Sequence, residues 1–296
     1  MRKINKAYAS PPAELTSIRC KRQLLRINNT RNGSAATYYH KAQVVTELNK
    51  LYHNKCGYCE ARINVVATEN VEHYRPKASV NTVDLPAGTT HRGYYWLGNE
   101  WSNLLIACPK CNQNGNKGTR FPLRNMGYRI STPPALSPAG EIVIASNSHS
   151  LAPLSAEDPL ILNPEVKYPK RHLKIIDTGE LVPVRNSIYA RTTIGVCDLN
   201  RDPLVAARKR IIDDIIIELE KKILSHNAPV EPLTEYQFRR ELDGVFDWIA
   251  ARLKETATFT LVGAMLVKDF DTLILAKLDP VFRPVIRDQF NVYLNS

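Results

Sequence analysis

The 296-residue chain lacks any run of about 18–20 apolar residues, the length that a helix needs to cross a membrane. Its first residues, Met-Arg-Lys-Ile-Asn-Lys, lead into Pro11-Pro12 without the apolar core of a secretion signal. The chain also shows no internal repeat, no low-complexity run and no helix-turn-helix or other base-reading module. We therefore expect a cytoplasmic protein, and little sequence preference in any binding to nucleic acid.

Cysteine is scarce, and its placement does not fit a disulfide framework. Four of the six cysteines form two short pairs, Cys56-Gly-Tyr-Cys59 and Cys108-Pro-Lys-Cys111, separated by 48 residues. Such spacing points two thiolates of each pair at one tetrahedral ion. Four thiolates favour zinc and leave no open coordination position, so we expect a structural Zn²⁺ and chemistry elsewhere. Cys20 and Cys197 are isolated in sequence, and we interpret both as structural thiols.

Acidic residues are scarce in the first part of the chain. Residues 1–130 contain 20 Lys+Arg against 7 Asp+Glu, whereas residues 131–296 contain 20 against 22. The net charge of +11 therefore comes entirely from the part that carries the paired cysteines. Clustered basic charge is typical of proteins that bind a polyanion, because contacts to phosphates release condensed counterions. A basic surface that serves only solubility is the simpler alternative.

The pattern of residues predicts an α+β protein in three parts. Residues 1–130 form a basic N-terminal region whose compact core lies at about 54–123. Residues 131–200 are rich in Pro, Ser, Ala and Asn and predict a loop-rich connector with short strands. Residues 201–296 predict a mainly helical C-terminal region, which is a possible docking surface for a partner.

Local patterns predict the following elements. Apolar residues at helical spacing indicate a helix over residues 34–53, leading into the first cysteine pair. Residues 70–75 are expected to be extended before Pro76, and residues 172–176 and 181–184 predict a β-hairpin. Helices are expected at 203–225, 234–255 and 257–277. Tyr94-Tyr95-Trp96 and Trp101 could stack on bases, but flanking leucines favour packing in the core.

An acid and an imidazole, Glu72-His73, lie between the cysteine pairs, and Asn103 and Asn112 follow in order. This arrangement resembles the HNH nucleases, whose ββα-metal fold surrounds one divalent cation. The resemblance implies that His73 is the general base and that Glu72 and Asn112 hold a catalytic Mg²⁺ or Mn²⁺ through oxygen atoms. It also implies that Asn103 supports the loop carrying the histidine. A neutral imidazole with a pKa near 6.5 suits proton abstraction, and oxygen ligands suit these cations.

Arg75, Lys77 and Lys117 are the candidates for contacts to phosphate, on the basis of their charge; solvated surface charges are the alternative. The sequence departs from the commonest HNH pattern at two positions. Glu72 stands where aspartate is more usual, and Asn112 stands where histidine is common. Both residues keep an oxygen donor, although the longer glutamate leaves the geometry around the cation open.

Several segments resemble more closely the PtuB subfamily, the HNH effectors of Septu-type and retron-associated anti-phage systems. They are Cys56-Gly-Tyr-Cys59-Glu60, Val71–Lys77, Tyr94–Leu97, Trp101–Leu104, Cys108–Asn112, Phe121-Pro-Leu123 and Glu157–Pro164. The resemblance covers roughly residues 36–210. It implies a zinc-stabilised endonuclease in anti-phage defence, with a PtuA-like ATPase as partner. A retron reverse transcriptase and its nucleic acid are the further partners that the retron-associated systems imply.

Other functions remain open at this point. HNH sites usually cut DNA, but the same chemistry at phosphorus does not exclude RNA such as tRNA. A zinc module that binds nucleic acid without cutting it is a third hypothesis, in which Glu72-His73 would be ordinary polar residues. An unrestrained nuclease would damage its own host, so we expect the near-neutral residues 131–296 to carry the docking surface for a restraining partner.

Overall fold

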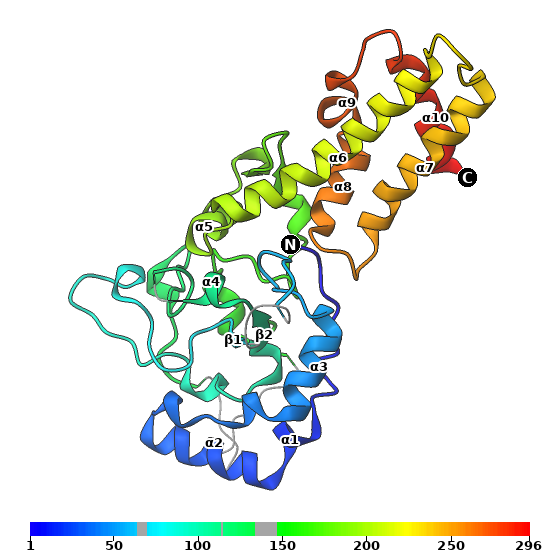
Figure 1. Ribbon diagram of the computed structural model, residues 1–296. Coiled ribbons are helices and arrows are strands. Elements are labelled where there is room, and N and C mark those ends of the chain that lie inside the picture. Colours follow the sequence, from blue (N-terminus) through cyan, green and yellow to red (C-terminus); the bar gives the residue numbers. More distant parts are fainter. Residues whose placement is uncertain (64–69, 114, 134–146) are drawn as a thin grey trace. The chain divides into compact units, whose positions relative to one another are not determined.

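The computed structural model describes residues 1–63, 70–113, 115–133 and 147–296, and these form two compact units (Figure 1). The larger unit comprises Arg2–His172 and Arg185–Leu199. The smaller unit comprises Met1, Leu173–Val184 and Asn200–Ser296. The described residues are mostly helical with one two-stranded sheet in each unit, which agrees with the mixed α and β class expected. No helix among them is both long enough and apolar enough to span a bilayer.

The three-part division at residues 130 and 200 stays a prediction. Part of the predicted connector, residues 134–146, lies outside the described residues.

The larger unit begins with three helices, α1 (Ala13–Thr16), α2 (Ile18–Thr30) and α3 (Ala42–Tyr52). In α3 the buried residues Val44, Leu48 and Tyr52 recur every four positions, so one face of the helix packs against the core. The unit also contains α5 (Ile188–Val196), which Ser187 caps by accepting a hydrogen bond from the backbone N–H of Ala190.

The predicted helix over residues 34–53 is wrong in its first half. In place of that half, the chain makes two 3₁₀ turns, Gly33–Ala35 and Tyr38–His40, before α3 begins. The side-chain Oδ1 of Asn99 accepts hydrogen bonds from the backbone N–H groups of Tyr38 and Tyr39, at 3.1 and 3.2 Å. A tertiary contact therefore uses these two amides, and the local pattern could not reveal it.

Two short strands and a short helix follow one another around the paired cysteines. Strand β1 (Asn70–His73) pairs antiparallel with β2 (Leu104–Ala107), so that Glu72 lies opposite Leu105 and His73 opposite Leu104. This confirms the extended conformation expected before Pro76 for Asn70–His73, whereas Tyr74 and Arg75, which were also expected to be extended, lie in a bend. Helix α4 (Pro109–Asn112) follows β2 directly, with Pro109 at its first position, where a missing N–H costs nothing.

The core of the larger unit is aromatic. Tyr94, Tyr95, Trp96 and Trp101 are each 5% exposed or less, which confirms that these rings pack in the interior and do not present a stacking surface. Phe121 lies among them, with its ring centroid 5.6 Å from that of Tyr94.

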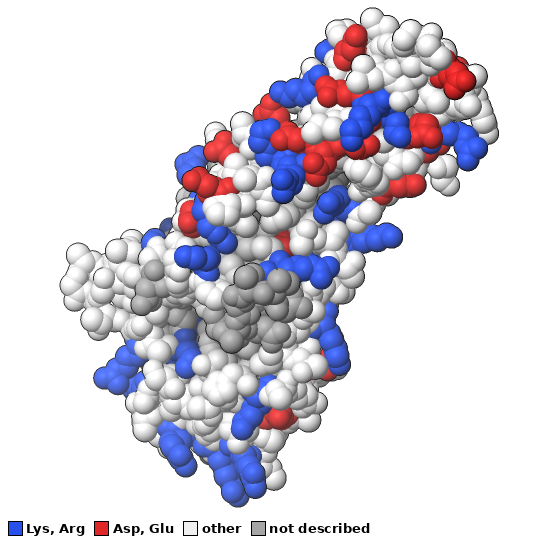
Figure 2. Space-filling model, viewed as in Figure 1, with Lys and Arg blue, Asp and Glu red and all other residues white. Residues whose placement is uncertain are grey.

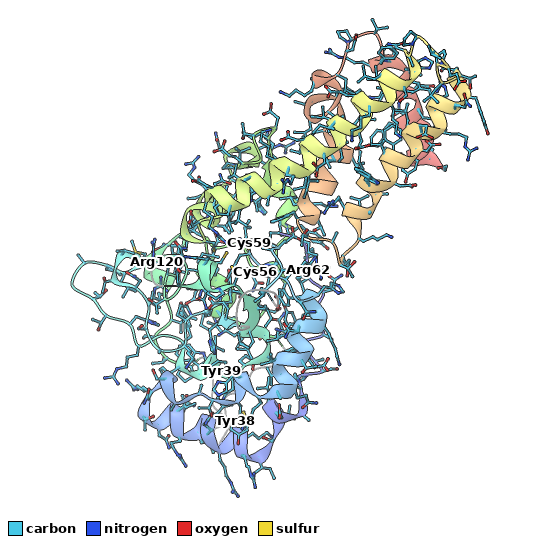
Figure 3. All side chains as sticks on the ribbon, in the orientation of Figure 1. Tyr38, Tyr39, Cys56, Cys59, Arg62 and Arg120 are labelled. Carbon is cyan, nitrogen blue, oxygen red and sulfur yellow. The ribbon has the colours of Figure 1, made fainter. Side chains whose placement is uncertain are left out.

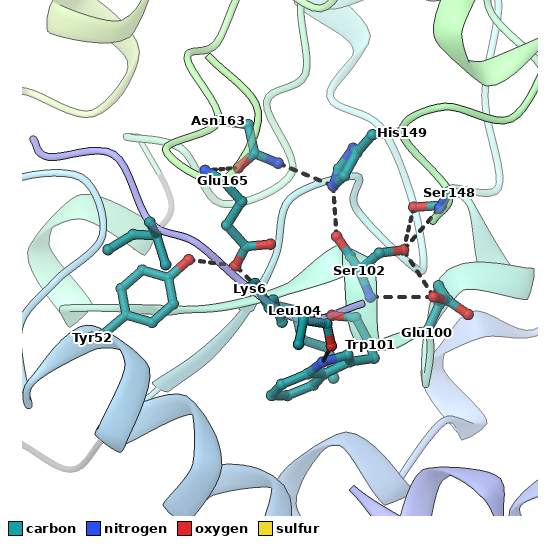
Figure 4. Close-up of polar contacts among 12 residues, drawn as sticks. Lys6, Tyr52, Glu100, Trp101, Ser102, Leu104, Ser148, His149, Asn163 and Glu165 are labelled. Atoms are coloured by element: carbon teal, nitrogen blue, oxygen red, sulfur yellow. Dashed lines mark hydrogen bonds and ion pairs between the residues drawn. The ribbon is translucent and has the colours of Figure 1, made fainter. Parts of the chain in front are cut away.

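A buried ion pair ties together segments that are distant in sequence (Figure 4). The ammonium of Lys6 donates to the carbonyl oxygens of Trp101, at 2.7 Å, and Leu104, and it lies 3.2 Å from the carboxylate of Glu165. The hydroxyl of Tyr52 donates to the same carboxylate at 2.6 Å. Lys6 thus anchors the N-terminal segment against the turn that leads into β2.

The smaller unit consists of helices and one hairpin. Its helices are α6 (Asp202–His226), α7 (Glu235–Leu253), α8 (Thr260–Lys268), α9 (Phe270–Leu273) and α10 (Arg283–Asn295). A capping box between Thr234 and Gln237 begins α7. The rings of Phe246, Phe270 and Phe290 pack together, and Phe270 stacks on Phe290 with centroids 3.9 Å apart.

The predicted hairpin is confirmed as β3 (Leu173–Ile175) and β4 (Leu181–Pro183), which pair antiparallel. The helices predicted at 203–225 and 234–255 correspond to α6 and α7. The single helix predicted at 257–277 is wrong, because α8 ends at Lys268 and α9 begins at Phe270 after a break in helical geometry at Asp269. Helix α10 was not predicted.

We predict that Lys6→Met lowers the free energy of unfolding by about 3–5 kcal/mol, because it leaves the buried Glu165 without its counter-charge. Chemical denaturation measures this change. Lys50→Met is the matched control, since Lys50 pairs with Glu47 on the surface, and we expect it to change stability by less than about 1 kcal/mol. Equal effects of the two substitutions would contradict a structural role for the Lys6 ion pair.

Candidate metal centre and active site

The structure brings all four paired cysteines together in what we call the cysteine cluster. The Sγ atoms of Cys56, Cys59, Cys108 and Cys111 all lie within 4.8 Å of one another, and only Cys108 is half-exposed. Hydrogen bonds from the neighbouring thiols lower the pKa of Cys108, which favours a thiolate. Figure 3 labels Cys56 and Cys59 in the larger unit. A compact set of four sulfur ligands, three of them buried, is consistent with a structural zinc.

Glycine at position 57 allows the first cysteine pair to approach β2 closely. The backbone N–H of Gly57 donates to the carbonyl oxygen of Ile106 at 2.8 Å. A Cβ atom at this position would lie 2.8 Å from the ring of Tyr52 and 3.2 Å from that same carbonyl. The second pair lies at the junction of β2 and α4, where the N–H of Cys111 donates to the carbonyl of Cys108. The strand β2 therefore connects both halves of the cluster.

The other two cysteines are not part of the cluster. Burial raises the pKa of Cys20 to about 11, and it raises the pKa of Cys197 well above its ordinary range. Both thiols are fully buried and stay protonated at neutral pH, as expected for structural thiols.

Glu72 is a buried carboxylate on β1, with 4% of its surface exposed. Burial raises its pKa, while the ammonium of Lys117 and a hydrogen bond from the side chain of Asn112 act in the opposite direction. Asn112 is the last residue of α4. Two of the predicted oxygen ligands, one from β1 and one from α4, thus lie side by side.

His73 follows Glu72 on β1 and is held in one orientation. Its Nε2 lies 2.8 Å from the carbonyl oxygen of Gly98. A carbonyl oxygen only accepts, so Nε2 carries the proton and Nδ1 keeps the lone pair. Burial lowers the pKa of His73 to about 3, so the imidazole is neutral at physiological pH. The ring of Tyr39 meets the imidazole edge-on, with centroids 4.5 Å apart.

Asn103 is fully buried and binds two segments near His73: the residues that follow His73 in the chain and the turn that precedes Gly98. Its Oδ1 accepts from the backbone N–H of Arg75 at 2.8 Å, and its Nδ2 donates to the carbonyls of Arg75 and Leu97, at 3.0 and 3.2 Å. Leu97 directly precedes Gly98, whose carbonyl orients His73. Asn103 therefore fixes both the strand end and the turn that determine the position of the imidazole.

The three side chains predicted to contact phosphate differ in burial and in their partners. Arg75 is buried, and its guanidinium donates to Glu157 at 2.9 Å and to the carbonyl of Leu154 at 2.9 Å. Lys117 is also fully buried, where it pairs with Glu72 and donates to the carbonyl of His73 at 2.8 Å. Both side chains are buried and bind other residues of the protein, so in this structure they are not exposed for the predicted contact to phosphate. Lys77 is half-buried, with its ammonium 4.9 Å from the centre of the Tyr39 ring.

Two groups that contact His73 were not predicted from the sequence. The carbonyl of Gly98 contributes no side chain, so no sequence signal reveals it. Tyr39 belongs to the segment that was assigned to a helix, and only the Tyr38–His40 turn brings its ring to His73.

The geometry allows specific chemistry. A carboxylate and an amide that lie together fit a hard divalent cation such as Mg²⁺ or Mn²⁺, whose preferred ligands are oxygens. A neutral imidazole with one nitrogen fixed by a hydrogen bond presents the other as a proton acceptor.

Comparison with known proteins gives two relatives. The chain is 36% identical over 200 residues to the Septu protein PtuB of Bacillus mycoides (strain KBAB4), over 67% of this chain and 60% of that protein. It is 25% identical over 194 residues to the Septu protein PtuB of Bacillus thuringiensis, over 65% of this chain and 54% of that protein. The matched part spans less than two thirds of either relative's length. No protein-family model matches the chain.

We predict that the purified protein contains about one zinc ion per chain and that Cys59→Ser removes most of it, because three thiolates bind the ion less tightly. Elemental analysis after dialysis measures the metal content. Cys20→Ser is the control, since Cys20 lies outside the cluster and its replacement leaves the zinc in place. Unchanged zinc content in Cys59→Ser would rule out the cluster as the binding site.

Proposed function

Because this chain is a homologue of the Septu protein PtuB, we propose that it is a metal-dependent HNH endonuclease that acts in anti-phage defence. One observation carries the proposal: Glu72 and His73 are adjacent, buried residues on β1, with Asn112 at the carboxylate and the imidazole oriented by the carbonyl of Gly98. DNA is the proposed substrate, with RNA as an alternative that the same test distinguishes.

Glu72 and Asn112 are the residues that would hold the divalent cation. When bound there, Mg²⁺ or Mn²⁺ supplies positive charge that stabilises the negative charge developing on phosphate oxygens during hydrolysis. The cysteine cluster is a separate, sulfur-only site, and in this proposal its zinc serves the fold alone.

His73 is proposed as the general base, accepting a proton from the attacking water at Nδ1. Its hydrogen bond from Nε2 to Gly98 leaves Nδ1 unprotonated and fixes the direction of the lone pair. The low pKa favours the neutral form but makes the isolated imidazole a weak base. An anionic phosphate beside the ring raises that pKa, because negative charge stabilises the imidazolium. Substrate binding therefore brings the base closer to its effective range.

Lys117 has a distinct role in this proposal. Its buried ammonium balances the charge of Glu72 in the protein without a divalent cation, so the carboxylate is never an unpaired buried charge. The hydrogen bond to the carbonyl of His73 also holds the end of β1 in place. We therefore assign Lys117 to the support of the acid–imidazole pair, and the contacts to phosphate to other residues.

The resemblance also implies a PtuA-like ATPase as partner. A nuclease without sequence preference must be restrained in its host, and an ATPase that holds the nuclease until infection would supply that restraint. The near-neutral region after residue 130 is the proposed docking surface, and the basic region before it meets nucleic acid.

We predict that the wild-type protein with Mg²⁺ cuts supercoiled plasmid or total tRNA, tested with and without the ATPase. His73→Ala should lower the cleavage rate by about 100- to 10,000-fold, the contribution typical of a general base. His172→Ala is the matched control, because His172 lies in the same unit and hydrogen-bonds only to Ser187 among the described side chains.

The substrate that is cut decides between DNA and RNA. Zinc content and melting temperature of His73→Ala establish that the variant is folded. If wild type and His73→Ala bind nucleic acid equally and neither cuts it under any of these conditions, the chain is a zinc-stabilised binding module and the proposed activity is wrong.

A further inference from the structure

Helix α2 carries a stripe of exposed arginines that the sequence analysis did not single out. Arg19, Arg22 and Arg26 are all exposed and are spaced three and four residues apart, so they lie on one face of the helix. The stripe extends along about 10 Å of helix axis. Buried Cys20 and Ile27 anchor the neighbouring face in the core. We call these three residues the arginine stripe.

Among the residues that the structure describes, the stripe has no acidic counterpart. Helix α2 contains no aspartate or glutamate. Within the part of the chain that the structure describes, no carboxylate forms an ion pair with any of the three arginines, whereas Lys209 and Lys221 in the smaller unit each pair with an acid on their own helix. Figure 2 shows Lys and Arg side chains projecting at the lower end of the view, where α2 lies in Figure 1. The positive charge of this face is therefore uncompensated.

Hydrogen bonds connect α2 directly to the candidate active site. Gln23, which borders the stripe, accepts at Oε1 from Nδ2 of Asn99 at 2.8 Å and from the backbone N–H of Thr37 at 3.0 Å. Asn99 directly follows Gly98, whose carbonyl orients His73. The helix that carries the stripe is thus linked to the imidazole through the side chains of Gln23 and Asn99 and the backbone of Gly98.

A second set of contacts runs along the same edge. Just past the end of α2, Gly33 approaches the backbone of Lys77 so closely that a Cβ atom would lie 1.7 Å from the Lys77 carbonyl oxygen. The ammonium of Lys77 lies over the ring of Tyr39, which contacts His73. Figure 3 labels Tyr38 and Tyr39 in the part of the larger unit where α2 lies in Figure 1. Half-buried Lys77 therefore lies between Gly33, just past the end of α2, and the Tyr39 ring that contacts the imidazole.

We propose that the arginine stripe binds the phosphate backbone of the nucleic acid and guides it toward His73. The inference rests on the proposed function for what happens at His73, but the binding surface stands on the charge and geometry of α2. Guanidinium groups suit phosphate, because their planar donors match two of its oxygens. With Arg75 and Lys117 buried, this face supplies the exposed cations that the predicted contacts lacked. It gives no base readout, so binding is independent of sequence.

The test compares two triple variants that lose the same charge, each in the His73→Ala background so that no probe is cut. One is Arg19→Gln/Arg22→Gln/Arg26→Gln. The matched control is Lys209→Gln/Arg210→Gln/Lys221→Gln, which removes three exposed cations from α6. Binding to a duplex DNA and to a duplex RNA of about 30 base pairs is measured as a function of salt concentration, with zinc content and melting temperature as checks of folding.

We expect the stripe variant to bind about 100-fold more weakly near 0.1 M salt. Its slope of log K against log salt should become shallower by about 2 to 3, since each lost phosphate contact removes roughly 0.9. The control should keep the slope of the parent. Equal slopes for the two variants, or no salt-dependent binding by the parent, would overturn the proposal and leave the stripe to an acidic protein partner. If binding depends on the stripe but the wild-type protein cuts nothing, the proposed nuclease function fails and this inference stands.

Discussion

Four cysteine sulfurs share one small, mostly buried volume, and the local structure around the candidate site depends on how that constraint is met. Thiolates packed this closely repel one another unless a cation binds them. Zinc meets that need, and in small modules it contributes about 10–16 kcal/mol that is in effect folding free energy. Strands of four residues and a helix of four residues have little else to hold them together. The cluster joins the loop before β1 to the junction of β2 and α4.

Once β2 is fixed by the cluster, the rest of the site follows through hydrogen bonds. The register of the two strands brings Glu72 and His73 opposite the first half of β2. Asn103, just before β2, then clamps both the end of β1 and the turn that carries Gly98. From the other side, Lys6 holds the carbonyls of Trp101 and Leu104, so the residues that flank Asn103 cannot shift. The imidazole is oriented by backbone groups that are themselves held on two sides.

The sequence revealed the parts of this arrangement that depend on ligand chemistry and spacing. The cysteine pairs come together as predicted, and Glu72, His73, Asn103 and Asn112 lie around one short strand pair, although their roles stay proposals. The positions of Arg75 and Lys117 could not be predicted, because a charged side chain beside a motif is equally consistent with a phosphate contact or with an internal ion pair. Only the tertiary structure brings Glu157 to Arg75.

Local patterns failed where tertiary contacts override them. Asn99 uses the amides that a helix before α3 would need, and α2 shows only two buried positions, too few for an apolar stripe to be recognised.

The most direct measurement is X-ray diffraction from crystals of the protein grown with Mn²⁺, with anomalous scattering recorded to locate each metal. We expect a zinc peak among the four cysteine sulfurs and a separate manganese peak in contact with side-chain oxygens of Glu72 and Asn112, beside His73. Manganese absent from Glu72 and Asn112, or bound only at the cysteines, would contradict the claim that one cluster builds the fold while a second, oxygen-lined site performs the chemistry.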